Sequence, residues 1–184
     1  MEAASTPSGS SSRLLVAALV GAAVALTLGI YGHVHDPSGK LVFTLFFTST
    51  ISMKVWLATI AAGFAVVQVL LAIWLYGKLP WDPPGWVGGV HRISGRLAFL
   101  VSLPVAYHCL WSLGFQDTTS RVLAHSLLGC AFYGAFAAKV IVVRAKNLPG
   151  AALPVVGGLV FAVLIAVWFT SAFWFIDNQG FPSV

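Results

Sequence analysis

The chain has 184 residues, of which 59% are hydrophobic and only 8% are charged, and its formal net charge is +5. Soluble domains average roughly 45–50% apolar and about 25% charged residues, so the composition excludes an ordinary soluble domain and indicates an integral membrane protein. About five spans take up the whole length, which leaves no room for a soluble catalytic domain. Nucleic acid is not an expected partner, because the basic residues flank apolar segments and form no patch with interleaved aromatic residues.

The first apolar segment lies close to the N-terminus. Residues 1–13 are small and polar, and we expect them to form a disordered tail on the cytoplasmic side. The apolar run over residues 14–30 resembles a signal peptide in position, but one basic residue precedes it and no convincing cleavage site follows it. We therefore expect it to be a retained first span.

Four further spans complete an all-α fold, an integral membrane bundle of five transmembrane helices in one domain over residues 14–176. They are predicted over residues 52–76, 91–113, 121–143 and 151–176. Residues 41–50 are apolar but too short to cross a membrane, so they either lie at the interface or extend the second helix. Residues 177–184 form a short outer tail.

The placement of charge predicts the orientation. Seven basic residues fall on the side of the N-terminus, namely Arg13, Lys78, Arg92, Arg96, Lys139, Arg144 and Lys146. Three fall on the other side, namely Lys40, Lys54 and Arg121. The positive-inside rule therefore predicts an N-in, C-out protein. We expect a multi-pass protein of the cell's inner, cytoplasmic membrane that has lipid as a partner.

Two histidines, His108 and His125, lie inside apolar spans, where an ionisable residue is uncommon and suggests function. They lie roughly 8 Å and roughly 12 Å to the outer side of the middle of the third and fourth spans, at about 1.5 Å per residue. A short turn joins these two antiparallel spans, so we expect the histidines to be neighbours at similar depth. Facing histidines on neighbouring helices are the ligands of a bis-histidine haem, which predicts one haem b whose iron is bound by both.

Three nearby residues favour this site. Gly129 and Arg121 lie four residues after and before His125, on the same helix face. The glycine leaves room for a flat ring, and the arginine could pair with a haem propionate. Lys54 is a second candidate to pair with a haem propionate. The alternative is that both histidines form hydrogen bonds between helices and bind no cofactor.

A further pair of histidines, His33 and His35, follows the first span and precedes Asp36. Alternate residues of an extended loop point the same way, so the pair could bind copper or zinc. The alternative is that they are ordinary histidines at the membrane interface.

A third group, His91 with Arg92 and Arg96, lies at the inner end of the third span. His91 is about 25 Å from His108 along an ideal helix, so the two cannot serve one haem. We interpret the group as an inner anchoring cluster, with a site for a quinone head group or an anionic partner as the alternative.

Three segments, HRISG at 91–95, AYHC at 106–109 and HSLLGCAFYGAF at 125–136, resemble the membrane cores of b-type cytochromes. The similarity is to the ferric-reductase-like and the ascorbate- or quinol-oxidising groups, and also to a family of uncharacterised bacterial five-span proteins. It covers the third and fourth spans, and it implies haem b, electron transport and quinol as a possible partner. Those cytochromes usually hold two haems with four histidines. This chain departs from that pattern and has no flavin or nicotinamide domain, so it is not a complete reductase.

The resulting interpretation is a membrane b-type cytochrome with a haem near the outer face. It would relay electrons between quinol, or a partner membrane subunit, and an acceptor on the outer side. The alternative is a cofactor-free accessory subunit of a larger membrane complex, assembled with partner subunits or as a homo-oligomer. A small transporter finds little support, because no acidic residue lies within a span.

Overall fold

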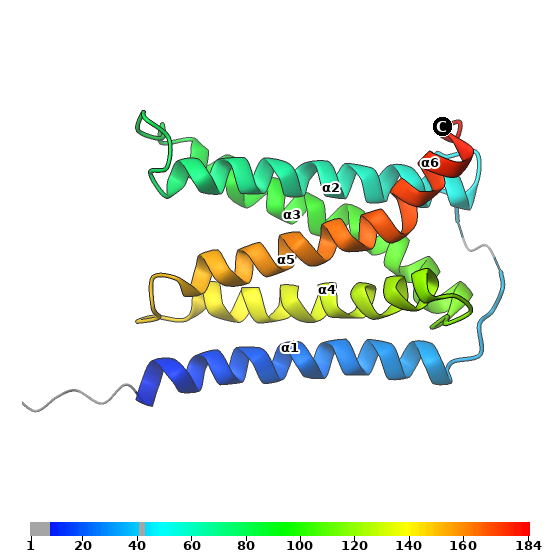
Figure 1. Cartoon of the computed structure of the whole chain (residues 1–184), viewed down its shortest axis with the longest axis horizontal. Helices are drawn as coiled ribbons and strands as arrows, with labels where there is room; N and C mark the ends of the chain where they lie inside the picture. The colour runs from blue at the N-terminus through cyan, green and yellow to red at the C-terminus, as the bar shows by residue number, and fades with distance from the viewer. Residues whose placement is uncertain (1–7, 41–42) are drawn as a thin grey trace, which may run out of the picture.

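The described part of the chain has five long helices. They lie alongside one another and alternate in direction (Figure 1). The structure is a computed structural model of the chain and describes residues 8–40 and 43–184. The helices are α1 (Ser8–Val34), α2 (Thr50–Leu75), α3 (Val87–Tyr107), α4 (Ser120–Arg144) and α5 (Ala152–Trp168). Helix α3 continues into the π-helix η1 (His108–Leu113), and α5 continues through the π-helix η2 (Phe169–Phe173) into α6 (Trp174–Gln179). The prediction of an all-α protein with five spanning helices is confirmed.

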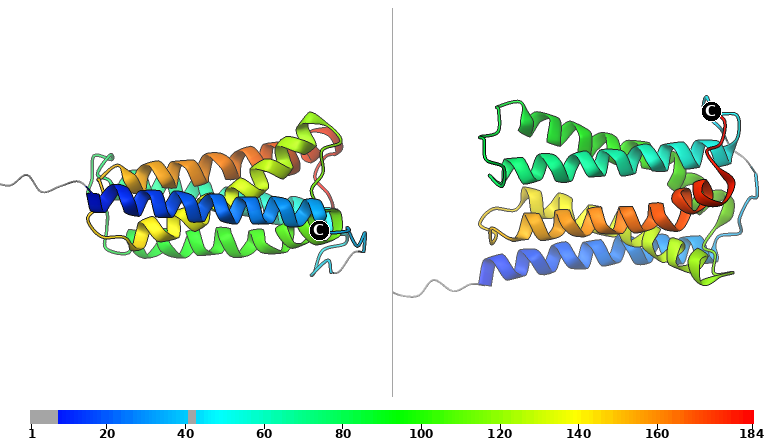
Figure 2. Two further views of the ribbon diagram at one scale, coloured as in Figure 1. Left: turned by 90° about the horizontal axis from the view of Figure 1, so that it is seen from below. Right: turned by 45° about the horizontal axis from the view of Figure 1, so that its top comes forward.

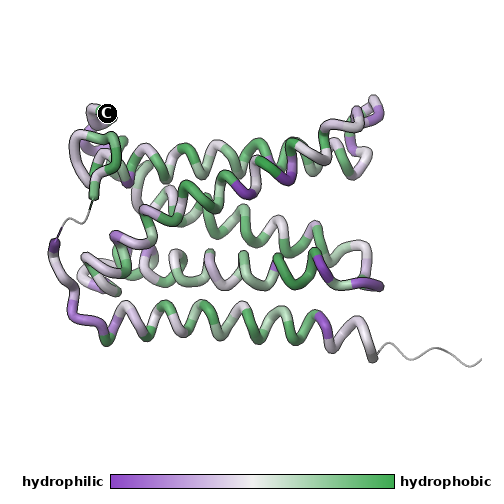
Figure 3. The backbone as a smooth tube through the Cα atoms, turned by 180° about the vertical axis from the view of Figure 1, so that it is seen from behind, coloured by the Kyte–Doolittle hydropathy of each residue, from purple (hydrophilic) through white to green (hydrophobic). Residues whose placement is uncertain are grey.

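Each of the five helices is long and apolar enough to cross a membrane. The shortest of these candidate spans has 25 residues, and at about 1.5 Å per residue it is longer than the roughly 30 Å of a bilayer's hydrocarbon core. Hydrophobic positions fill the helices, and most hydrophilic ones gather toward the two ends of the bundle (Figure 3). Large apolar side chains such as Leu19, Leu70 and Leu159 are exposed, as lipid-facing residues are. The chain is a multi-pass membrane protein.

The two ends of the bundle differ in charge. One end, called the basic end from here on, holds the start of α1 and the connections from α2 to α3 and from α4 to α5. Its seven cations are Arg13, Lys78, Arg92, Arg96, Lys139, Arg144 and Lys146. Here the Arg13 guanidinium donates a hydrogen bond to the Lys146 carbonyl and ties α1 to the loop after α4. The predicted orientation, with the basic end in the cytoplasm, stays a prediction.

Both termini differ from the boundaries expected from sequence. Residues 8–13, predicted to belong to a disordered tail, form the first turns of α1, while residues 1–7 lie outside the described residues. The C-terminal residues fold back onto α2, where Trp56 Nε1 donates a hydrogen bond to the Pro182 carbonyl over 3.1 Å. Ser52 Oγ donates a second bond to the Ser183 carbonyl. The short polar tail is thus docked on the bundle.

Helix α1 packs against α4 on one side of the bundle, and α2 packs against α3 and α5 (Figures 1 and 2). The α1–α4 contact is a close approach of two glycines. A Cβ atom built on Gly21 would lie 2.8 Å from the carbonyl oxygen of Gly134 and 3.1 Å from Cβ of Ala138. Small residues of this kind let membrane helices approach each other backbone to backbone.

Candidate functional site

A cavity of about 400 Å³ lies between α2, α3, η1, α4, α5 and η2, in the half of the bundle away from the basic end. Its volume is within the range of small-molecule sites, which is about 300–1,000 Å³. Its walls are mainly apolar. The polar side chains around it include Lys54, Ser102, Cys109, Arg121, His125 and Tyr133.

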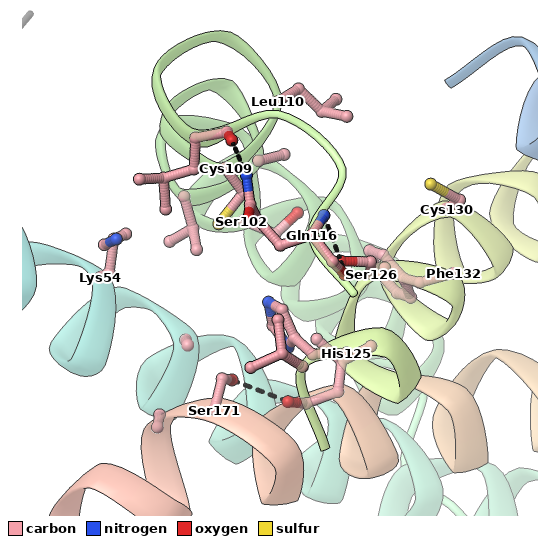
Figure 4. A pocket seen from close by; sticks show the side chains of 18 of the residues that line it. Lys54, Ser102, Cys109, Leu110, Gln116, His125, Ser126, Cys130, Phe132 and Ser171 are labelled. Carbon is pink, nitrogen blue, oxygen red and sulfur yellow. Dashed lines mark hydrogen bonds between the residues drawn. The ribbon is translucent and has the colours of Figure 1, made fainter. Parts of the chain in front are cut away.

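His125 projects from α4 into this cavity, between Lys54 and Ser126 as seen in Figure 4. Its Nδ1 atom lies 3.4 Å from Oγ1 of Thr170 in η2. The hydroxyl of Thr170 already donates its one hydrogen to backbone carbonyls. Its Oγ1 lies 2.9 Å from the carbonyl oxygen of Ala166. It can therefore only accept from His125, which assigns the proton to Nδ1 and leaves the lone pair of Nε2 free. The Val167 carbonyl is a second acceptor for the imidazole, beside Thr170.

Arg121 is held at the same cavity by two contacts. Its Nη1 donates a hydrogen bond to the Thr170 carbonyl over 2.7 Å. Its guanidinium carbon lies 3.9 Å from the centre of the Trp174 ring, which is a cation–π contact. These contacts orient the guanidinium and leave some of its five N–H groups for a ligand.

Lys54 supplies a second positive charge from α2. Its ammonium group forms no ion pair or hydrogen bond with any residue that the structure describes. Among the described residues, no acidic side chain lines the cavity. Two unneutralised cations beside an apolar space favour a ligand with an apolar body and negatively charged groups.

Gly129 lines the cavity one turn after His125. A Cβ atom built on this residue would meet no other atom within 4 Å. The absence of a side chain therefore leaves open space in the cavity. A ring in that space stays a prediction.

The structure does not bring His108 to this cavity. His108 is only 1% exposed, and its Nδ1 lies 3.1 Å from the Pro104 carbonyl. Its ring packs edge-on against Phe43 at 4.6 Å between centroids, and its Nε2 has no partner among the described residues. Neighbouring residues of an α-helix are turned about 100° apart. Cys109 lines the cavity, whereas His108 is outside the cavity lining.

His33 and His35 do not converge on one point. Helix α1 continues through Val34, so the extended loop that would align the pair is absent. His35 lies between the rings of Tyr31 and Trp111, at 5.0 Å and 4.6 Å between centroids. His33 faces Phe115 edge-on at 6.3 Å. No group of three metal-ligating side chains occurs in the described residues, so the predicted copper or zinc site gains no third ligand.

His91, Arg92 and Arg96 lie on the first turns of α3, at the basic end and outside the cavity lining. Gln68 of α2 donates hydrogen bonds to the His91 carbonyl and, over 2.7 Å, to Ser94 Oγ. This anchors the start of α3 on α2. The group is therefore separate from the site around His125.

Three hydroxyl residues at or beside the cavity, Thr170, Tyr133 and Ser102, were not predicted from the sequence. Thr170 lies in the fifth span, and its contact with His125 depends on the packing of α4 on η2. Tyr133 Oη and Ser102 Oγ lie 2.9 Å apart and join α4 to α3 at the cavity wall. Each was visible only as a hydroxyl residue within an apolar run.

The chain belongs to DUF6529, a family of unknown function, whose sequence model matches residues 14–183. No curated protein and no solved structure matches the chain. The family match covers all five spans, and these comparisons show no relationship to cytochromes.

Proposed function

We propose that the cavity binds one haem b and that the protein relays electrons within the membrane. The observation that carries this proposal is the placement of His125, which projects into an apolar cavity flanked by two cations, Lys54 and Arg121, with no acidic partner among the described residues. Neutral imidazole nitrogen is the commonest protein ligand of haem iron in b-type sites. Haem is also a flat apolar ring with two carboxylates, so all three features of the cavity match it.

Each residue has a separate role in this proposal. His125 binds the iron, and Thr170 holds its imidazole in the tautomer that presents Nε2. Lys54 and Arg121 pair with the propionates. Gly129 leaves space for the ring, and the apolar walls exclude water. The haem itself supplies the one-electron couple, and the protein supplies binding, orientation and burial.

The structure changes one part of the sequence-based hypothesis. The sequence predicted two iron ligands, His108 and His125. Because His108 packs against Phe43 outside the cavity lining, we assign ligation to His125 and a packing role to His108.

The position of the cavity supports electron exchange at the end of the bundle opposite the basic end. The cavity extends to Arg121 and Trp174 near that end. Quinol or a partner membrane subunit is the proposed electron donor. The acceptor would lie on the outer side of the membrane if the basic end is cytoplasmic.

The test is a dithionite-reduced minus oxidised visible spectrum of the purified full-length protein in detergent. A pyridine haemochrome assay on the same sample gives the stoichiometry. We expect a b-type spectrum and about one haem per chain, as one axial imidazole in one cavity requires. A folded, monodisperse and colourless protein that takes up no added haemin would overturn the proposal.

That negative result would favour the second candidate, a cofactor-free accessory subunit of a larger membrane complex. The observation that favours it is the packing of His108, which serves as a buried core residue. The search would then move to the membrane partners of the chain.

A further inference from the structure

We propose that the basic end binds the phosphate of one anionic phospholipid at the seam between α3 and α4, through Arg92, Arg96 and Lys139. This site is independent of the proposed haem and lies at the other end of the bundle. The seam, the exposed face of α3 and the lack of acidic partners each support it.

A pair of stacked aromatic rings defines the seam. The rings of Phe99 on α3 and Phe136 on α4 lie 4.2 Å apart between centroids, with 12° between their planes. The two helices are antiparallel (Figure 1). Arg96 lies three residues before Phe99, and Lys139 three residues after Phe136, so both are about 4.5 Å nearer the basic end.

The third cation, Arg92, lies on the first turns of α3, at the same end of the seam. Arg92 lies one turn before Arg96, on the same face of the helix. The Phe99–Phe136 contact and the one-turn spacing of the two arginines thus place all three cations at the same end of the α3–α4 seam.

The exposed face of α3 is charged at its start and apolar further along, as a phospholipid is. Arg92 and Arg96 are both exposed at its start. Further into the membrane the same face carries Leu100 and Leu103, which are 55% and 40% exposed. A lipid whose phosphate lies at the arginines would lay an acyl chain along these leucines.

The three cations have no partner in the described part of the chain. No ion pair or side-chain hydrogen bond involves them, and the acid nearest in sequence, Asp82, lies in the loop before α3. A cation within an apolar span is costly unless an anion or water neutralises it. Phosphate suits this site, because arginine binds it bidentately and lysine as a point charge. The membrane supplies that phosphate at the depth of the headgroups.

The test is native mass spectrometry of the full-length protein in detergent, titrated with phosphatidylglycerol or phosphatidylcholine of the same acyl chains. We expect phosphatidylglycerol to bind at least about tenfold more tightly. The double variant Arg92→Gln, Arg96→Gln should bind phosphatidylglycerol about thirtyfold more weakly, since each arginine near the headgroups contributes to the attraction. The control Lys78→Gln removes one positive charge from the exposed loop at the same end, as Lys139→Gln does from the seam, and should change the affinity less than twofold.

Lys139→Gln keeps the test decisive if the double variant does not fold, and it should weaken phosphatidylglycerol binding about fivefold. Circular dichroism and a monodisperse elution profile check that each variant is folded. Equal binding of the two lipids would overturn the proposal. A loss of phosphatidylglycerol affinity in Lys78→Gln as large as that in the seam variants would also overturn it. Glycerol phosphate that binds as tightly as the lipid would show a site for soluble phosphate instead.

Discussion

The Nδ1 atom of His125 lies 3.4 Å from Oγ1 of Thr170, across the contact between α4 and η2. The threonine hydroxyl donates to the Ala166 carbonyl, so its oxygen is the acceptor for the imidazole. The backbone carbonyl of Thr170 also accepts a hydrogen bond from the Arg121 guanidinium. One residue of the fifth span thus orients both the proposed iron ligand and a proposed propionate partner.

Replacing Thr170 by valine removes the hydroxyl and keeps the shape of the side chain and the backbone carbonyl. The His125 imidazole loses the Thr170 hydroxyl as an acceptor, and the tautomer with the proton on Nδ1 is less favoured. We expect haem affinity to fall by about 10- to 100-fold, the usual effect of removing a partner of a metal-binding histidine. Absorbance titration of the apoprotein with haemin measures it. Thr27→Val, on the exposed face of α1, is the matched control. Wild-type affinity in Thr170→Val would show that this contact has no role.

The two cations of the cavity should each contribute to haem affinity. Lys54→Gln and Arg121→Gln remove one charge each, and we expect about tenfold weaker binding from each, as for the loss of a charge-assisted hydrogen bond. Lys40→Gln removes a charge from the exposed loop at the same end and should have little effect. Haem dimethyl ester, which has no free carboxylates, should bind both variants as well as it binds wild type. An equal loss of ester affinity would contradict the pairing with propionates.

Filling the cavity should exclude the ligand without unfolding the protein. Gly129→Leu places a side chain in open space, so we expect the helix content to be kept and haem binding to be lost. Gly63→Leu is the matched control, because Gly63 also has open space at its Cβ position but lies on the exposed face of α2. The check is haem stoichiometry beside circular dichroism. Full occupancy in Gly129→Leu would place the ligand elsewhere.

The α1–α4 contact predicts opposite effects for the same substitution at two glycines. A methyl group on Gly134 would overlap the Gly21 carbonyl, so Gly134→Ala should destabilise the bundle by about 1–3 kcal/mol through overpacking. Gly157→Ala has open space and should leave stability unchanged or raise it by up to about 1 kcal/mol, because alanine favours helix over glycine. Denaturant unfolding in mixed micelles measures both. Equal effects of the two substitutions would show that the close approach does not stabilise the fold.

The number and type of the spans could be predicted from sequence, because each apolar run is long enough to cross a bilayer. The depth of His108 and His125 in the membrane, predicted by counting residues along those spans, stays a prediction. The direction in which each side chain points did not follow, since one residue turns a helical side chain by about 100°. That single step places Cys109 at the cavity and His108 against Phe43. The role of Thr170 could not be predicted from the sequence either, because it depends on which helix packs beside α4.

The decisive measurement is the visible spectrum of two alanine variants, His125→Ala and His108→Ala, each purified in the same detergent and supplied with haemin. The proposed site predicts that His125→Ala loses the Soret band and bound haem, while His108→Ala keeps about one haem per chain. Loss of haem from both variants would support ligation of the iron by both histidines and contradict the assignment of a packing role to His108. Full haem occupancy in His125→Ala would contradict the proposed site itself.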